Sequence, residues 1–370
     1  MKRRAIDPRP DWRSRVEAQG LVFHTTKTEG VYWGEGTFYE FTSREIDAIA
    51  TATGEIHQMC LAAASRVIRD QRYAELGIDP RSSVLIEQSW NRRDPALYGR
   101  LDLAFGPDGV PKLLEYNADT PTSLLEAAVI QWTWFEELGL RGDQANALHE
   151  KLIERWRVMA PGPLVHFASV DDLEDQMTIG YLRDTAEQAG LATAQIDMTQ
   201  LGWDPARQCL VDLEGRTITT LFKLYPWEGL TTDTLAGALP TISTRWIEPA
   251  WKMCLSNKAI LPILWEMFPG HPNLLPAARQ PIGDAWVKKP LLGREGSNVT
   301  IHAPGIDDAT SGPYEESFIY QAYADLGTHD GMHPVIGAWL VGDAPAGIGI
   351  RETPGRITSN TARFIPHIIV

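Results

Sequence analysis

The sequence predicts a mixed α/β fold (α+β), in which antiparallel strands and helices are combined with a parallel-sheet unit. The first observation is a buried-strand pattern at 164–168, then a helical segment around 180–190 and a second strand pattern at 193–197. A strand–helix–strand unit of this length is typical of a parallel sheet. The second observation is an Asp-Gly turn at 108–109 between alternating segments, which is typical of an antiparallel hairpin. The 370 residues are 44% hydrophobic, enough for two or three subdomains with their own cores.

Three helices are expected before residue 160. A capping-box pattern at 42–45 precedes apolar residues at helical spacing over 46–67, which predicts a long amphipathic helix. A second helix is expected at about 123–138. A third is expected at about 148–159 and ends at the Pro-Gly-Pro segment 161–163, where we place a domain boundary.

The C-terminal half is expected to be strand-rich. An apolar helix at 259–265 is the exception. The expected strands are 221–225 and 241–244, with weaker patterns, and then 286–290, 318–323 and 346–351. His329 and His333 lie in a segment that is expected to be a polar loop, because a third metal ligand is missing nearby.

Charge and composition limit the partners. The net charge of −14 disfavours nucleic acid and anionic membranes, since both are bound through basic patches. No apolar run approaches the length that spans a membrane, and no apolar signal segment follows Met1. We therefore expect small-molecule partners, no nucleic acid, no membrane, and a cytoplasmic location.

The hairpin around residue 108 carries the most informative residues. If Asp108-Gly109 is a two-residue loop, Asp102 lies opposite Glu115 and Arg100 lies opposite Asn117, all on one face. Leu101, Leu103, Phe105, Leu114 and Tyr116 then take the other face. Two carboxylates held opposite one another destabilise a sheet unless a cation lies between them, and Mg²⁺ beside substrate phosphates is a common choice. A solvated hairpin with its acids neutralised by Arg100 is the alternative.

Basic residues follow after residue 246, at places suited to phosphate. Lys258 lies near a helix N-terminus, where a cation is unfavourable unless an anion joins it. Lys289 ends a strand and leads into a loop with Gly293 and Gly296, whose backbone amides are free to approach phosphate oxygens. Arg351 ends a strand of small residues, where its guanidinium is placed to meet developing phosphate charge.

The ordered set of these motifs resembles the synthetase domain of the glutathionylspermidine synthase family and its stand-alone relatives, which are ATP-grasp ligases. The likeness covers roughly residues 20–370. The motifs that carry it are Arg-x-Asp at 100–102, Glu-Tyr-Asn-Ala-Asp at 115–119, Asn-Lys-Ala-Ile-Leu-Pro-Ile-Leu-Trp at 257–265, Val-Lys-Lys-Pro-Leu-Leu-Gly-Arg-Glu-Gly-Ser-Asn at 287–298, Tyr-Gln at 320–321 and Gly-Ile-Arg at 349–351. The resemblance implies an ATP-grasp fold with a preATP-grasp-like parallel-sheet subdomain.

The resemblance also implies roles for individual residues. Asp102, Glu115 and Asn117 match the ligands of two Mg²⁺ ions, and Arg351 matches the arginine credited with stabilising the transition state. Residues that match ATP contacts are Arg100, Lys258, Lys289, Glu295, Gly296, Gln321, Ala322, Tyr323 and Ala324. Residues that fall in substrate-contact regions are Thr120, where the family has a serine, Glu174 and Gly229. Two Mg²⁺ ions and ATP are the expected cofactors, and the amidase domain of the bifunctional members is not expected.

The implied activity is an ATP- and Mg²⁺-dependent ligation of a carboxylic acid to an amine through an acyl phosphate. The acid is expected to be a small peptide such as glutathione and the amine a polyamine. The expected domains are 1–162 with the metal-binding hairpin, 163–245 as a preATP-grasp-like substrate subdomain, and 246–370 as the nucleotide-binding region with the glycine-rich flap. An ATP-dependent phosphotransferase and a catalytically silent nucleotide-binding scaffold are the alternatives.

Overall fold

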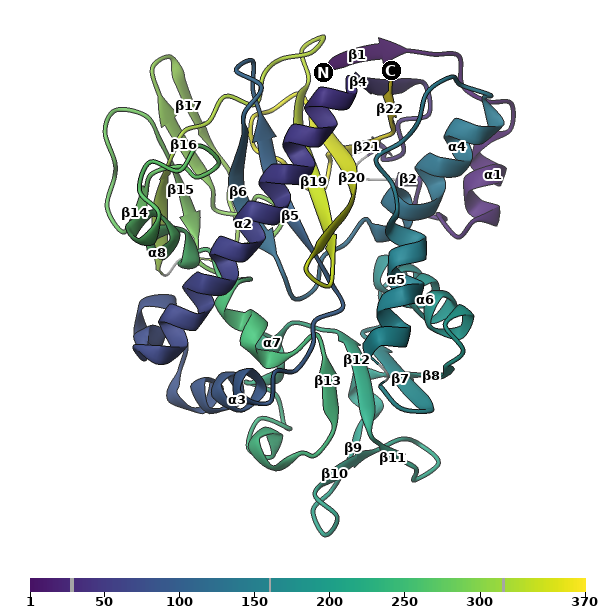
Figure 1. Cartoon of the computed structure of the whole chain (residues 1–370), viewed down its shortest axis with the longest axis vertical. Helices are drawn as coiled ribbons and strands as arrows, with labels where there is room; N and C mark the ends of the chain where they lie inside the picture. Colours follow the sequence, from purple (N-terminus) through teal and green to yellow (C-terminus); the bar gives the residue numbers. More distant parts are fainter. Residues whose placement is uncertain (27–29, 160, 315–316) are drawn as a thin grey trace.

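Three larger sheets form the body of the protein. The computed structural model describes residues 1–26, 30–159, 161–314 and 317–370. Two of the sheets are antiparallel with five strands each, and the third is parallel with four. In Figure 1 the antiparallel sheets occupy the upper half of the molecule and the parallel sheet lies below them. The predicted mixture of α/β elements is confirmed.

The first antiparallel sheet contains the predicted hairpin. Its strand order is β21-β20-β19-β5-β6. The strands are β5 (Tyr98–Phe105), β6 (Pro111–Asn117), β19 (His333–Val341), β20 (Ala344–Thr353) and β21 (Arg363–Ile365). Helix α2 (Ser43–Arg69) runs across one face of this sheet, as Figure 1 shows, and begins at the predicted capping box of Thr42 and Glu45.

The second antiparallel sheet faces the hairpin from the other side of a cavity. Its order is β14-β18-β15-β16-β17. The strands are β14 (Ala277–Ala278), β15 (Trp286–Pro290), β16 (Thr300–Ala303), β17 (Ile306–Ala309) and β18 (Phe318–Ala322). Helix α8 (Ile260–Met267) packs against β14, β18 and α2.

The parallel sheet confirms the predicted strand–helix–strand unit. Its order is β13-β12-β7-β8. The strands are β7 (Leu164–Ser169), β8 (Ala192–Asp197), β12 (Thr220–Leu224) and β13 (Arg245–Ile247), and α6 (Leu173–Gln188) connects β7 to β8. Helix α5 (Leu148–Met159) packs beside α6 and has the predicted bounds.

Smaller elements complete the chain. The short strands are β1 (Lys2–Ala5), β2 (Thr25–Thr26), β3 (Gly30–Val31), β4 (Thr37–Phe41), β9 (Gly202–Asp204), β10 (Cys209–Val211), β11 (Thr217–Ile218) and β22 (His367–Ile369). The remaining α-helices are α1 (Trp12–Ala18), α3 (Pro80–Asn91), α4 (Gln131–Glu137) and α7 (Trp227–Leu230). Single helical turns are η1 (Arg72–Leu76), η3 (Met198–Gln200), η4 (Leu239–Thr241) and η5 (Ala250–Cys254), and a π-helical segment at Glu126–Ile130 runs directly into α4. No helix within the described ranges is long and apolar enough to span a bilayer.

Two expectations about individual strands and loops outside the hairpin are wrong. Residues 241–244 are not a strand, because a helical turn ends at Thr241 and β13 begins at Arg245. His333 does not lie in a loop, because it begins β19, where its ring Nδ1 lies 2.8 Å from the carbonyl oxygen of Gly327. Strand β19 is buried along its whole length between β5 and β20, so it lacks the alternation that marks a half-buried strand.

The apolar core lies on both sides of the first antiparallel sheet. One cluster joins α2 to the sheet through residues such as Ile56, Cys60 and Leu101. The other joins β19 to α5 and the parallel sheet through Trp339, Trp156 and Phe167, among others. The hairpin thus packs its apolar face on the first cluster and joins the second at Tyr98, which keeps the side chains of its other face in fixed positions.

Candidate active site

The β5–β6 hairpin brings the acidic motifs together. Asp102 pairs with Glu115 across the ladder, and Arg100 pairs with Asn117. Both pairings agree with the register predicted from the sequence. Asp102 and Arg100 are buried, whereas Glu115 and Asn117 are half-buried at the sheet edge.

The loop that connects the two strands differs from the prediction, although the register at Asp102 agrees with it. Residues 106–110 connect Phe105 to Pro111, so Asp108-Gly109 is not a two-residue loop. This longer loop shifts the pairing by one residue, and a bulge at Leu114 restores it before Glu115. The side chain of Leu114 therefore lines the cavity, and its predicted place on the core face is wrong.

Two arginines hold the carboxylate of Asp102. The Arg100 Nε and Nη2 atoms lie 2.7 Å and 3.1 Å from its two oxygens, and Arg351 Nη2 lies 2.8 Å from Oδ2. Arg351 comes from β20, with β19 between it and β5. Gly337 of β19 pairs with Asp102, and a Cβ there would lie 2.8 Å from Arg100 Cδ. A glycine at this point leaves room for the Arg100 side chain over the sheet.

Two lysines surround Glu115. Lys258 Nζ lies 2.9 Å from Glu115 Oε2, and Asn117 Nδ2 donates to Glu115 Oε1 at 3.3 Å. Burial opposes ionisation of this carboxyl, but Lys258 and Lys289 outweigh it and lower the pKa of Glu115 to about 2. Burial in turn lowers the pKa of Lys289 to about 8, with Glu115 opposing the shift. Glu115 is therefore an anion at neutral pH.

The bulge connects the hairpin to the opposite sheet. Lys289 Nζ donates to the Leu114 carbonyl at 3.0 Å and to Gln321 Oε1 at 2.7 Å. Gln321 Nε2 donates to the Leu113 carbonyl at 2.8 Å. The carbonyl groups of Leu113 and of the bulged residue Leu114 thus accept hydrogen bonds from β18 and β15. These bonds fix the separation between the two walls of the cavity.

The glycine-rich loop lines one side of the cavity through residues 293–297. Lys258 Nζ donates to the Gly293 carbonyl at 2.6 Å, and Arg294 Nη2 donates to Thr120 Oγ1 at 3.3 Å. Gly296 has a φ of 68°, and a Cβ there would lie 2.5 Å from the Thr358 carbonyl oxygen. The loop therefore needs glycine at 296 for its conformation and for its close contact with the C-terminal segment.

These elements enclose a cavity of about 420 Å³. Residues of the predicted site that line it are Arg100, Asp102, Glu115, Asn117, Thr120, Lys258, Lys289, Glu295, Gly296, Gln321, Ala322, Tyr323, Ala324 and Arg351. The structure brings these residues together although they come from six separate segments of the chain. Gly229 is not among the lining residues, because its neighbour Glu228 on α7 faces the cavity instead.

Sequence reasoning did not select several lining residues. Asp119 and Glu228 line the cavity, and both lie inside segments whose motifs were noticed, at 115–119 and 227–229. Burial raises the pKa of Glu228, and the charge of Asp119 adds to the shift. Arg356 and Tyr314 also line the cavity, but no pattern in the sequence distinguishes them from other loop residues.

A second cavity of about 270 Å³ adjoins the first and is acidic. Thr122, Glu295 and Arg351 line both cavities, while Glu174 and Asp172 line the second alone. Glu174 therefore lies in the adjoining cavity and not in the one that holds the other predicted site residues. Burial, with help from the Asp172 and Glu295 charges, raises the pKa of Glu174.

A buried carboxyl lies behind this second cavity. Tyr32 lines it, and the Tyr32 hydroxyl donates to Glu126 Oε1 at 2.6 Å. Burial and the charge of Glu174 raise the pKa of Glu126 to about 7. Glu126 belongs to the π-helical segment, a local irregularity that is frequent at functional sites.

The residues present fit a magnesium ion held with phosphate. Hard oxygen donors are available on Asp102, Glu115 and Asn117, and the Glu115 carboxyl is ionised. Within residues 1–26, 30–159, 161–314 and 317–370, no three His, Cys, Asp or Glu side chains are grouped so as to hold a metal by themselves. The donor set is thus two carboxylates and an amide, to which phosphate oxygens would add.

Two antiparallel sheets that enclose a cavity, with a parallel sheet beneath them, agree with the ATP-grasp-type fold expected from the sequence. Comparison with protein families agrees: the chain belongs to the family described as "Glutathionylspermidine synthase preATP-grasp", whose model matches residues 3–370. This family carries ATP-binding and ligase chemistry.

Individual relatives are similar over most of this chain. A Haemophilus influenzae protein provisionally named an acid–amine ligase is 43% identical, with 98% of each chain covered. Trypanothione synthetase of Crithidia fasciculata is 31% identical over 84% of this chain and 53% of its own length. The bifunctional glutathionylspermidine synthetase/amidase of Escherichia coli is 30% identical over 90% of this chain and 59% of its own length. The chain thus spans a little over half of these last two relatives.

Proposed function

We propose that this protein joins a carboxylic acid to an amine at the expense of ATP and Mg²⁺, through an acyl phosphate. The observation that carries the proposal is the cavity between the two antiparallel sheets, where Arg100, Lys258, Lys289 and Arg351 surround Asp102 and Glu115. Within this cluster, four cations against two carboxylates leave an excess of positive charge, while the rest of the cavity carries Arg294 and Arg356 beside Asp119, Glu228 and Glu295. A polyphosphate with its magnesium ions is the kind of ligand that balances it.

The proposed chemistry has two steps. An oxygen of the acid's carboxylate attacks the γ-phosphorus, the bond to the β-phosphate oxygen breaks, and ADP leaves. The amine nitrogen then attacks the acyl carbon, inorganic phosphate leaves with the bonding electrons, and the amine loses a proton. The net products are the amide, ADP and phosphate. Bound magnesium would neutralise phosphate charge during the first step.

The roles proposed for the residues follow their places in the cavity. Lys258, Lys289 and Arg100 bind phosphate oxygens, and Arg351 stabilises charge on the transferring phosphoryl group. Asp102, Glu115 and Asn117 hold magnesium, for which two ions are proposed. Gln321 to Ala324, at the end of β18, contact the adenine. Loop 293–298, with Glu295 and Gly296, covers the acyl phosphate and excludes water from it.

The substrates are proposed from the outer parts of the site. Thr120, which accepts a hydrogen bond from Arg294 of the loop, and Glu228 of α7 border the place proposed for the acid, a small peptide such as glutathione, and Gly229 lies next to Glu228 on that helix. The second cavity is lined by the carboxylates Glu174 and Asp172. A polyamine cation suits this negative cavity, and Arg351 between the two cavities marks where acid, amine and phosphate would meet.

The domains are proposed with the bounds given above. Residues 1–162 supply the hairpin, 163–245 contain three of the four parallel strands, and 246–370 supply the second antiparallel sheet with its flap. Strands β19 and β20 of the last segment complete the sheet of the first.

The test measures ADP release from ATP with paired candidates: glutathione or other small peptides as the acid, and spermidine or other amines as the partner. The expected result is ADP release that needs both partners, with one amide formed per ADP by mass spectrometry. ADP release with the acid alone, and a stable phosphorylated product, would instead show a phosphotransferase. Nucleotide binding without any ADP release across the panel would favour the silent scaffold.

A further inference from the structure

Glu248 and Lys252 form a fully buried ion pair just after β13. Glu248 Oε2 and Lys252 Nζ are 2.6 Å apart, and the side chains are 0% and 1% exposed. Among the described residues that line the two cavities, neither of these two is found. The pair is therefore not a site for a ligand, and its contacts must explain its presence.

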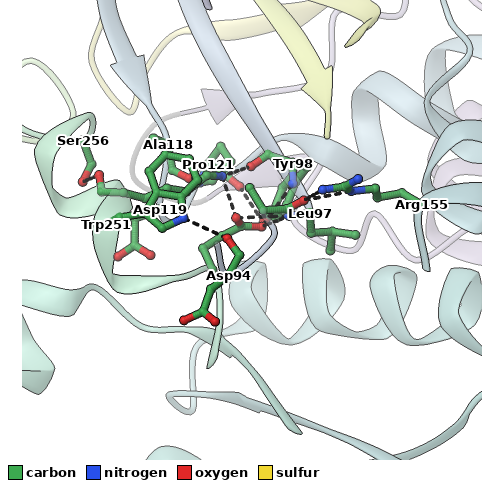
Figure 2. A network of polar contacts seen from close by, with 12 residues as sticks. Asp94, Leu97, Tyr98, Ala118, Asp119, Pro121, Arg155, Trp251 and Ser256 are labelled. Carbon is green, nitrogen blue, oxygen red and sulfur yellow. Dashed lines mark hydrogen bonds and ion pairs between the residues drawn. The ribbon is translucent and has the colours of Figure 1, made fainter. Parts of the chain in front are cut away.

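Both side chains direct their hydrogen bonds to the open end of the catalytic hairpin. Glu248 Oε1 accepts from the backbone N–H groups of Leu97 at 3.0 Å and Tyr98 at 3.1 Å. Lys252 Nζ donates to the carbonyls of Tyr98 at 2.5 Å and Ala118 at 2.8 Å. Figure 2 shows Leu97, Tyr98 and Ala118 gathered around this network.

These contacts lie where the hairpin's own ladder has ended. The last pair between β5 and β6 at this end is Arg100 with Asn117. Tyr98 and Ala118 lie beyond it, and the ammonium of Lys252 bridges their two carbonyls. The Glu248–Lys252 ion pair thus replaces the next hydrogen-bonded pair of the ladder. It joins Tyr98, two residues before Arg100, to Ala118, one residue after Asn117.

A gain in folding stability does not explain why an ion pair is buried here. The cost of removing two charges from water is repaid only with good geometry, and well-packed apolar residues are often as stable. What an apolar pair does not supply is a fixed bridge between two strands. Residues that orient the metal-binding side chains without touching the metal commonly change metal affinity or activity by about 10- to 100-fold when they are removed.

We propose that Glu248 and Lys252 are positioning residues that fix the spacing of the hairpin's open end, and through it the alignment of Arg100 and Asn117 with Asp102 and Glu115. The effect on magnesium and phosphate rests on the proposed function, whereas the effect on the hairpin does not. Residues on the opposite sheet, such as Gln321, are held separately by the bulge and are outside the influence of the pair.

The test uses three variants of the full chain. Lys252→Met removes the bridge and leaves Glu248 without its cation. Glu248→Gln/Lys252→Met also removes the bridge but leaves no unpaired charge, and the amide still accepts from Leu97 and Tyr98. Arg9→Met is the matched control, because it breaks another buried ion pair, with Glu35 at 2.7 Å, away from both cavities.

Three quantities are compared: melting temperature, hydrogen exchange of peptides 97–102 and 115–120, and the gain in ADP affinity between EDTA and Mg²⁺ by calorimetry. We expect Lys252→Met to lower the melting temperature and to speed up hydrogen exchange in both peptides. The magnesium-dependent gain in ADP affinity should fall about tenfold or more. The double variant regains melting temperature, but its hairpin still exchanges faster and its magnesium-dependent gain stays low. Arg9→Met lowers only the melting temperature.

The proposal is overturned if the double variant recovers the hairpin's protection and the magnesium-dependent gain together with its stability. It is also overturned if the hairpin of Lys252→Met exchanges as slowly as that of Arg9→Met. If Lys252→Met fails to fold, the double variant carries the same comparison. If the wild-type protein binds magnesium nucleotide but forms no amide, the proposed function fails while these measurements still decide the role of the pair. If it binds no nucleotide, the exchange data decide it.

Discussion

Two charge clusters lie side by side near the open end of the β5–β6 hairpin, and they are built differently. At the edge facing the cavity, four cations surround Asp102 and Glu115, and the cluster borders open space. Just beyond the last rung, Glu248 and Lys252 balance one another, are enclosed, and form hydrogen bonds with backbone groups. A balanced cluster with every group satisfied is suited to holding a shape. A cluster with surplus charge next to a cavity is suited to binding something of the opposite charge.

Glu115→Gln is the strongest test of the cavity cluster. The change keeps the size of the side chain but removes the anion that Lys258 and Lys289 surround. We expect ADP release to fall by about a thousandfold, since a metal contributes several kcal/mol of charge stabilisation. The melting temperature should change little, because Glu115 is half-buried at a sheet edge. Turnover at the wild-type rate would remove Glu115 from the site.

Arg351→Ala should have the next largest effect, on rate and not on binding. The charge that this guanidinium is proposed to meet develops during phosphoryl transfer, so kcat should fall about a hundredfold while the Kd for ATP stays nearly constant. Asp102 keeps both contacts from Arg100, which leaves no unpaired carboxylate. Arg351→Lys should recover little, because an ammonium lacks the planar fork. Lost ATP affinity with an unchanged kcat would make Arg351 a ground-state contact.

Lys258→Ala and Lys289→Ala should mainly weaken ATP binding. Each removes a charged donor proposed to bind phosphate before and during transfer, so we expect the Kd for ATP to rise about tenfold or more in each variant. Calorimetry or equilibrium dialysis gives the value directly. An unchanged Kd in both variants would place the phosphates elsewhere in the cavity.

The smallest expected effect is on pH dependence. Burial lowers the pKa of Lys289 to about 8, so this amine loses its proton as the pH rises through 8 in the free protein. An uncharged amine attracts phosphate less, and ATP affinity should decline by a few-fold between pH 7 and pH 9. Lys289→Met should bind more weakly throughout and lose this dependence. A profile that keeps its shape in the variant would assign the titration to another group.

The hairpin shows which features of the site can be predicted from the sequence and which cannot. Alternation of apolar residues and the Asp-Gly signal led to the observed pairing of Asp102 with Glu115, although the two-residue loop on which the prediction depended is wrong. They did not reveal the bulge at Leu114, because an unpaired residue in a strand leaves the local pattern nearly unchanged. The predicted pairing next to the loop was one residue out, and the bulge compensates for that difference.

Other parts of the site depend on contacts between distant segments. Strand β19 was missed because a strand buried on both faces does not alternate, although its Gly337 makes room for Arg100. The second cavity combines Tyr32, Glu174 and the residues near 360, which only the folded chain brings together. The buried pair Glu248 and Lys252 has helical spacing and reads as an ordinary surface ion pair until its burial is known.

The bulge at Leu114 also determines which changes in length the hairpin can accept. The pairing of Asp102 with Glu115 is fixed between the bulge and the open end, so the loop at 106–110 can gain or lose residues without moving the carboxylates. Deleting Leu114 has the opposite effect, because a shift of one residue in a strand turns each side chain to the other face. Changes in length are therefore expected to be tolerated at the tip of this hairpin and not at Leu114, the residue that looks most dispensable within it.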